Sequence, residues 1–145
     1  MNNRAVFGSE SPMSLGIYPV FNPELKGTKF DALGEILVEE LDSLEKVARM
    51  AKLTPITAFA DNRPIPDDFD GDPDELSEVM GEWTEWFNPA EGQAVIQALA
   101  DYIRLNSKAA KRFEEPTEVL KEMEEMVRVL GVAAEQSLQF RLEMG

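Results

Sequence analysis

The chain has no cysteine and no histidine among its 145 residues. Without cysteine it forms no disulfide, offers no thiolate to zinc and has no cysteine nucleophile. Without histidine it lacks the commonest general base and the commonest transition-metal ligand, which excludes Ser-His-Asp and Cys-His catalysis. These absences predict a protein that is not an enzyme and that holds no cofactor and no metal.

Long hydrophobic runs are also missing. No stretch approaches eighteen consecutive apolar residues, so we expect no membrane-spanning helix. The first twenty residues carry one basic residue, Arg4, and no apolar run of seven, which does not match a secretory signal and predicts a cytoplasmic protein. The net charge of −14 is repelled by anionic lipid and by phosphate backbones, so we expect neither membranes nor nucleic acids as partners.

The composition that remains is that of a folded protein. Hydrophobic residues make up 43% of the chain and charged residues 29%, and the length suits one domain. Residues 1–12 mix Asn, Ser, Gly and Glu without periodicity, which indicates a loose N-terminal segment. Residues 13–145 are predicted to form a single helical domain.

Proline, capping residues and apolar spacing divide this domain into about four helices. The predicted helices run from Thr28 to Leu53, from Pro73 to Phe87, from Pro89 to Leu105 and from Pro116 to Leu138. Before them, Leu15 to Phe21 is rich in β-branched and aromatic residues, but Pro19 confines it to an edge strand or an extended arm. The predicted fold is therefore mainly α: a bundle of about four helices with an extended N-terminal segment, which pairs with Ile56 to Ala60 as a minor two-stranded β element.

Negative charge is concentrated in one stretch. Asp61 to Glu91 holds eleven Asp and Glu against the single base Arg63, which accounts for −10 of the net charge. The remaining residues are nearly balanced. Acid gathered in this way creates a local field that a cation or a basic protein can feel.

Within this stretch, Glu75, Glu78, Glu82 and Glu85 are spaced three, four and three residues apart, which places them on one ridge of the predicted helix. One interpretation is a solvated face over a buried aromatic stripe. The other is a docking surface for a basic protein, with acid for steering and a tryptophan as anchor. The predicted partner-binding residues are Asp67, Asp68, Asp70, Asp72, Glu75, Glu78, Glu82, Trp83, Glu85 and Trp86.

Two other classes of function stay open. The string PDDFDGDPDELSE contains D-x-D-G, but placing Gly71 at the sixth position of an EF-hand loop puts Pro66 at the first and Ser77 at the twelfth, where acidic ligands are needed. A Ca²⁺ site in the 67–72 loop is therefore an alternative without the full motif. The second alternative is an enzyme whose site folding assembles from dispersed carboxylates.

The sequence also contains one local cluster of basic residues, which consists of Arg104, Lys108, Lys111 and Arg112. These residues either form an anion site or neutralise the acidic ridge, within one chain or across a dimer. The chain is thus compatible with a monomer or a homodimer.

Three strings, GIYPVF (Gly16 to Phe21), PITAF (Pro55 to Phe59) and WFNPAEG (Trp86 to Gly92), resemble a group of small, uncharacterised bacterial proteins. The resemblance implies a bacterial cytosolic protein and attaches no activity to any residue. By charge and size, the chain also has the profile of immunity proteins that neutralise basic toxins. The predicted function is a non-catalytic, immunity- or inhibitor-like module that docks a basic partner through the acidic region 61–85.

Overall fold

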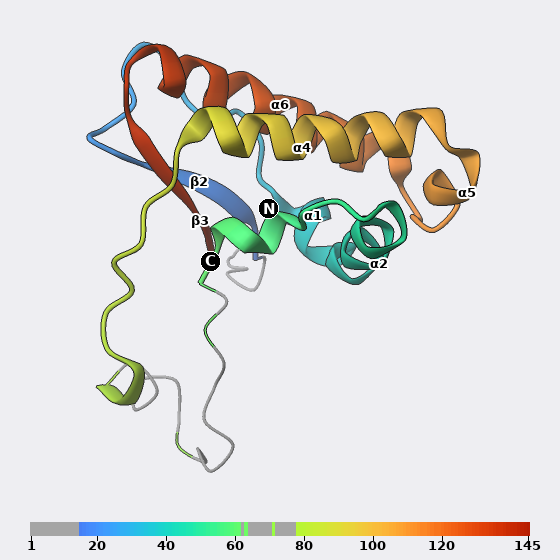
Figure 1. Cartoon of the computed structure of the whole chain (residues 1–145), viewed down its shortest axis with the longest axis horizontal. Coiled ribbons are helices and arrows are strands. Elements are labelled where there is room, and N and C mark those ends of the chain that lie inside the picture. Colours follow the sequence, from blue (N-terminus) through green and yellow to red (C-terminus); the bar gives the residue numbers. More distant parts are fainter. Residues whose placement is uncertain (1–14, 62, 64–70, 72–77) are drawn as a thin grey trace, which may run out of the picture.

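The computed structural model describes residues 15–61, 63, 71 and 78–145, and its elements are labelled in Figure 1. They are β2 (Ile17–Asn22), α1 (Glu35–Glu39), α2 (Leu41–Ala51), the 3-10 helix η1 (Ile56–Phe59), α4 (Pro89–Leu105), α5 (Ser107–Ala110), α6 (Pro116–Glu135) and β3 (Gln139–Met144). The predicted mainly helical fold with a small two-stranded sheet is confirmed, with more helices than four. No helix in this part of the chain has the length and apolar character needed to cross a membrane.

Helices α4 and α6 lie side by side and form the longest helical pair (Figure 1). Both begin where the sequence predicted. Asn88 caps α4 by accepting the Ala90 N–H at 2.8 Å, and Pro89 takes the first helical position. Gly131 of α6 allows a close approach to α4, since a Cβ there would lie 2.7 Å from the amide nitrogen of Gln93.

The sheet pairs β2 antiparallel with β3. Gly16 and Gly145 exchange both backbone hydrogen bonds, so the register leaves Pro19 at a non-hydrogen-bonded position opposite Leu142. The missing N–H of Pro19 therefore costs the ladder nothing, and the predicted edge strand is confirmed.

The partner of this strand differs from the prediction. Residues 56–60 do not pair with β2, because Ile56–Phe59 forms the 3-10 helix η1. The last helix ends at Glu135 rather than at Leu138, and Ser137 adopts a left-handed conformation (φ 59°) that turns the chain into β3. The sequence of β3, QFRLEM, alternates outward and inward residues, and it supplies the strand that Ile56 to Ala60 was expected to supply.

The first predicted helix is two helices, and it starts seven residues later than expected. Gly34 has a φ of 73° and packs so closely on Ile17 that a Cβ would overlap the Ile17 carbonyl oxygen. Residues 28–34 are not helical, and α1 begins at Glu35. Glu40, with φ −108° and ψ 21°, then separates α1 from α2.

The second predicted helix is wrong beyond residue 80. Residues 78–80 are helical, but Gly81 has a φ of 75° and residues 82–86 form no regular structure. Phe87 instead exchanges two backbone hydrogen bonds with Phe140 of β3, at 2.8 and 2.9 Å. The predicted start of this helix at Pro73, like the loose segment 1–12, lies outside the described residues.

A single cluster of buried side chains draws on every described element from β2 to β3. Its largest fully buried members are Phe140, Leu37, Leu44, Ile96, Leu99, Ile103, Met123, Met126, Leu130 and Leu142. The core therefore holds the sheet against the α4–α6 pair and fixes β3 in place.

Candidate functional site

Five of the predicted partner-binding residues lie in the described part of the chain. Glu78, Glu82 and Glu85 are exposed, whereas Trp83 and Trp86 are partly buried. The other five, Asp67, Asp68, Asp70, Asp72 and Glu75, lie outside the described residues, and so does all of the 67–72 loop proposed for Ca²⁺ except Gly71.

The predicted glutamate ridge does not exist in the form expected. Because the helix ends at residue 80, Glu82 and Glu85 do not share a helical face with Glu78. All three are still exposed, and none forms an ion pair with another described residue. Glu85 accepts a hydrogen bond from the Trp83 indole N–H at 3.2 Å.

Arg141 of β3 fixes the chain that carries these acids. Its guanidinium carbon lies 4.9 Å from the ring centroid of Trp83 and 4.5 Å from that of Trp86. It also donates to the Trp83 carbonyl oxygen at 2.7 Å and pairs with Glu143 at 3.0 Å. A cation–π contact contributes about 0.5–2 kcal/mol depending on its exposure, so two such contacts and a hydrogen bond hold both tryptophans against the sheet.

An aromatic layer continues from this stack into the core. The Phe87 ring lies 6.3 Å from Trp83, 5.4 Å from Phe59 and 6.3 Å from Phe140, centroid to centroid. Phe140 is fully buried. Trp83 is thus connected to the core through Phe87 and is not a free anchor on a helix surface.

Arg63 fixes the other end of the described acidic region. Its guanidinium binds the Asp61 carboxylate at 2.8 and 2.9 Å and donates to the carbonyl oxygens of Met80 at 3.0 Å and Gly81 at 3.3 Å. The hydrogen bond from Arg63 holds the pKa of Asp61 below its usual value. Arg63 therefore joins the chain that enters the acidic segment, defined as 61–85, to the helical turn near its end.

Carboxylates in the helical body have a different use. Glu40 is 9% exposed and accepts the backbone N–H groups of Glu114 and Glu115 at 2.7 and 2.9 Å, just before α6. Glu122 of α6 accepts those of Gly34 and Leu37 at 3.1 Å each and so caps α1. Sequence reasoning missed both roles, since the partners lie 74 to 88 residues away along the chain.

A hollow of about 370 Å³ between α1 and α6 gathers further acids, with Lys121 beside them. Burial raises the pKa of Glu122, whereas hydrogen bonds from Arg128 lower the pKa of Glu125. The acids of this hollow are Asp31, Glu35, Glu39, Glu118, Glu122 and Glu125. Across the described ranges, no three acidic side chains are grouped in a way that could hold a metal ion.

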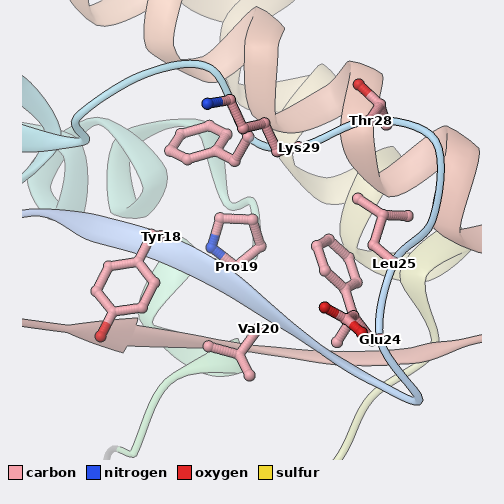
Figure 2. Close-up of a pocket in the computed structure, with 9 residues that line it drawn as sticks. Tyr18, Pro19, Val20, Glu24, Leu25, Thr28 and Lys29 are labelled. Carbon is pink, nitrogen blue, oxygen red and sulfur yellow. The ribbon is translucent and has the colours of Figure 1, made fainter.

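A second hollow, of about 350 Å³, lies between β2 and the chain at 24–30 (Figure 2). Pro19 and Leu25 line it with apolar surface, whereas the Lys29 amine and the Thr28 hydroxyl point away from it. The lining offers apolar contact, and the labelled polar groups do not converge on one point. It has none of the convergent polar chemistry that marks a catalytic pocket.

Comparison with family models, with curated proteins and with solved structures finds no match to this chain. The resemblance to small bacterial proteins therefore stays a prediction from the three strings. The role of the acidic segment has to be inferred from its own geometry and from that of Arg141.

Proposed function

We propose that the protein is a non-catalytic binding module, immunity- or inhibitor-like, that docks a basic partner protein through the acidic segment. One observation carries this proposal. Glu78, Glu82 and Glu85 are exposed and without ion pairs among the described residues, on a chain that Arg141 anchors to β3 and whose two ends Arg63 joins. The acids are thus presented on a held backbone rather than along a helical ridge.

Anchoring favours association because less conformational freedom is lost when a partner binds. The uncompensated charge attracts a basic surface over about one Debye length, roughly 8 Å at physiological salt, which accelerates encounter. The parts of Trp83 and Trp86 that remain exposed beside Arg141 then offer apolar contact next to the acids. Charge supplies steering in this scheme, and the aromatic surface supplies affinity.

The carboxylates of the helical body, which have a structural role, support the proposal that the acids of the segment are available for binding. Glu40 and Glu122 each bind two backbone N–H groups, so their charge is committed to the fold. Glu78 and Glu82 of the segment bind no backbone N–H group and no cation among the described residues. They are the ones whose charge is available to another molecule.

Affinity capture from a bacterial lysate at low and at high salt tests the proposal. The bait is the native chain or a variant carrying Glu78→Lys, Glu82→Lys and Glu85→Lys. We expect the native chain to retain a basic protein at low salt and to release it at high salt, and the variant to retain none.

A control variant carries Glu24→Lys, Glu39→Lys and Glu135→Lys, three exposed acids elsewhere on the surface, with the same change in net charge. It should behave as the native chain does. Equal recovery of the same proteins by all three baits would show that the acidic segment is only a solvated surface.

A further inference from the structure

An apolar groove of about 380 Å³ lies between the ends of α2 and α4. Ala51 and Leu53 line it from the α2 side, and Ala98, Tyr102 and Leu105 line it from α4. Leu105 is 84% exposed, the largest exposure of any large hydrophobic residue in the described part. The exposed leucine and the apolar lining beside it offer contact to an apolar side chain of another molecule.

The charged residues that neighbour this lining in the sequence are mostly basic. Arg49 and Lys52 lie at the end of α2, and Lys108 lies just beyond the end of α4. All three are exposed and form no ion pair with a described residue. Asp101 is the acid in the lining, and it is already bound by Arg104 at 2.9 Å and by Gln97 at 3.0 Å.

The acidic segment contains a turn whose apolar and acidic side chains complement the apolar lining and the nearby basic residues of this groove. Val79 is 61% exposed and stands between Glu78 and Glu82 in the sequence, two carboxylates that form no ion pair with a described residue. In Figure 1 residues 78–80 lie at the lower left, whereas the ends of α2 and α4 lie toward the right. Arg63 binds the carbonyl oxygen of Met80, which keeps this turn at its own end of the molecule. One copy therefore cannot place Val79 in its own groove.

We propose that the groove between α2 and α4 binds the 78–82 turn of a second copy of this chain. Val79 packs against Leu105, and Glu78 and Glu82 face Lys52 and Lys108. The inference rests on the proposed function, because it uses the acidic segment as the docking element and names one basic surface that it fits. The contact is head to tail, so a pair of copies keeps one free turn at one end and one free groove at the other.

The association is weak and depends on concentration. One apolar anchor with a few ion pairs falls below the roughly 1,200 Å² of buried surface that stable complexes use. Each copy also carries a net charge of −14, which opposes approach except where the basic rim meets the turn.

Sedimentation velocity with two complementary variants tests the contact. The turn variant carries Glu78→Lys, Val79→Lys and Glu82→Lys, and the groove variant carries Leu105→Glu and Lys108→Glu. All five side chains are exposed, so both variants should keep the fold, which circular dichroism checks. We expect the native chain to exceed the monomer mass as concentration rises and each variant alone to stay monomeric.

An equimolar mixture of the two variants is the decisive sample. The groove variant keeps the native turn, and the turn variant keeps the native groove, so the mixture should form heterodimers that do not grow further. A control with Leu33→Glu and Lys26→Glu, an exposed leucine and lysine elsewhere, should associate as the native chain does.

Two results would overturn the inference: a native chain that stays monomeric up to about 1 mM, or a groove variant that associates as strongly as the native chain. The groove variant keeps the acidic segment and therefore keeps capture of a basic partner. A monomeric native chain that still captures such a partner would remove the second-copy contact and leave the proposed function standing. A native chain that neither associates with itself nor captures a basic partner would overturn both the second-copy contact and the proposed function.

Discussion

The helical body and the acidic segment use the same side chain in opposite ways. In the body, Glu40 and Glu122 each accept two backbone N–H groups and hold helices in place. In the segment, Glu78 and Glu82 are exposed and bind no cation among the described residues. The difference teaches that net charge does not locate function by itself, because the partner of each carboxylate decides what it does.

The two uses have different energetic consequences. A carboxylate that satisfies buried backbone donors leaves them unpaired when it is removed, which costs more than the hydrogen bonds themselves contributed. An exposed carboxylate leaves only water behind. Substitutions should therefore divide sharply between the two regions, and the largest effects belong to the body.

Replacing Glu40 with alanine should have the largest effect. The substitution leaves the N–H groups of Glu114 and Glu115 without their acceptor, and we expect the free energy of unfolding to fall by about 2–3 kcal/mol. Urea denaturation followed by circular dichroism measures this change. Glu40→Gln keeps one acceptor oxygen and should lose less; an alanine variant as stable as the native chain would show that the cap is dispensable.

Arg141→Met should come next, since it removes the cation between two indole rings and the hydrogen bond to the Trp83 carbonyl. We expect a loss of about 1–2 kcal/mol and a shift in tryptophan emission as Trp83 and Trp86 come away from the sheet. Arg141→Lys keeps the positive charge but lacks the planar guanidinium group. Its free energy of unfolding should therefore lie between those of the native chain and the Arg141→Met variant. Unchanged emission in the methionine variant would mean that the stack does not hold the segment.

The contributions of Glu122 and Glu125 to the free energy of unfolding should change with pH in opposite directions. Carboxyl ¹³C NMR should place the pKa of Glu122 above its ordinary 4.5 and that of Glu125 below 4.5. The raised pKa of Glu122 gives a contribution to stability that is present below the unfolded pKa and is lost as pH rises through the folded value. Glu125 contributes above its unfolded pKa and loses that contribution as pH falls through the lowered value. Both groups titrating at the same pH would contradict the contacts described for α1 and Arg128.

The smallest effect on stability belongs to Glu78→Lys, Glu82→Lys and Glu85→Lys combined. Because these side chains are solvated, each substitution should change the free energy of unfolding by no more than about 0.5 kcal/mol. The same denaturation measurement checks this value against the control at Glu24, Glu39 and Glu135. A loss of unfolding free energy comparable to that of Glu40→Ala would show that these acids also stabilise the fold, and the helical body and the acidic segment would then not differ in their use of carboxylates.

What the sequence could predict depended on signals that act over a few residues. Asn88 with Pro89, and Pro116, mark the starts of α4 and α6, and Pro19 marks an edge strand; all three predictions are confirmed. Gly81 lies inside a run that also suits a helix, but it adopts a left-handed conformation, and Phe87 then pairs with Phe140 of β3.

The features that shape the candidate site act over long separations. Arg141 reaches Trp83 across 58 residues, and Glu40 reaches Glu114 across 74. No local pattern encodes such pairs. The alternating sequence QFRLEM does indicate a strand. Because Leu138 continues the apolar spacing of the preceding helix, however, that spacing gave no sign of the turn at Ser137.

The pairing of β2 with β3 has a consequence for the order of folding. β2 is synthesised first among the described elements and β3 last, so β2 waits for its partner while the helices form, and closing so long a loop is slow. Arg141 arrives with β3. Until then Trp83 and Trp86 lack the guanidinium that lies over their rings, while Arg63 can already bind Met80. A nascent chain therefore carries the charge of the acidic segment before Arg141 has fixed its shape, so under the proposed function a partner that needs both would bind only the folded protein.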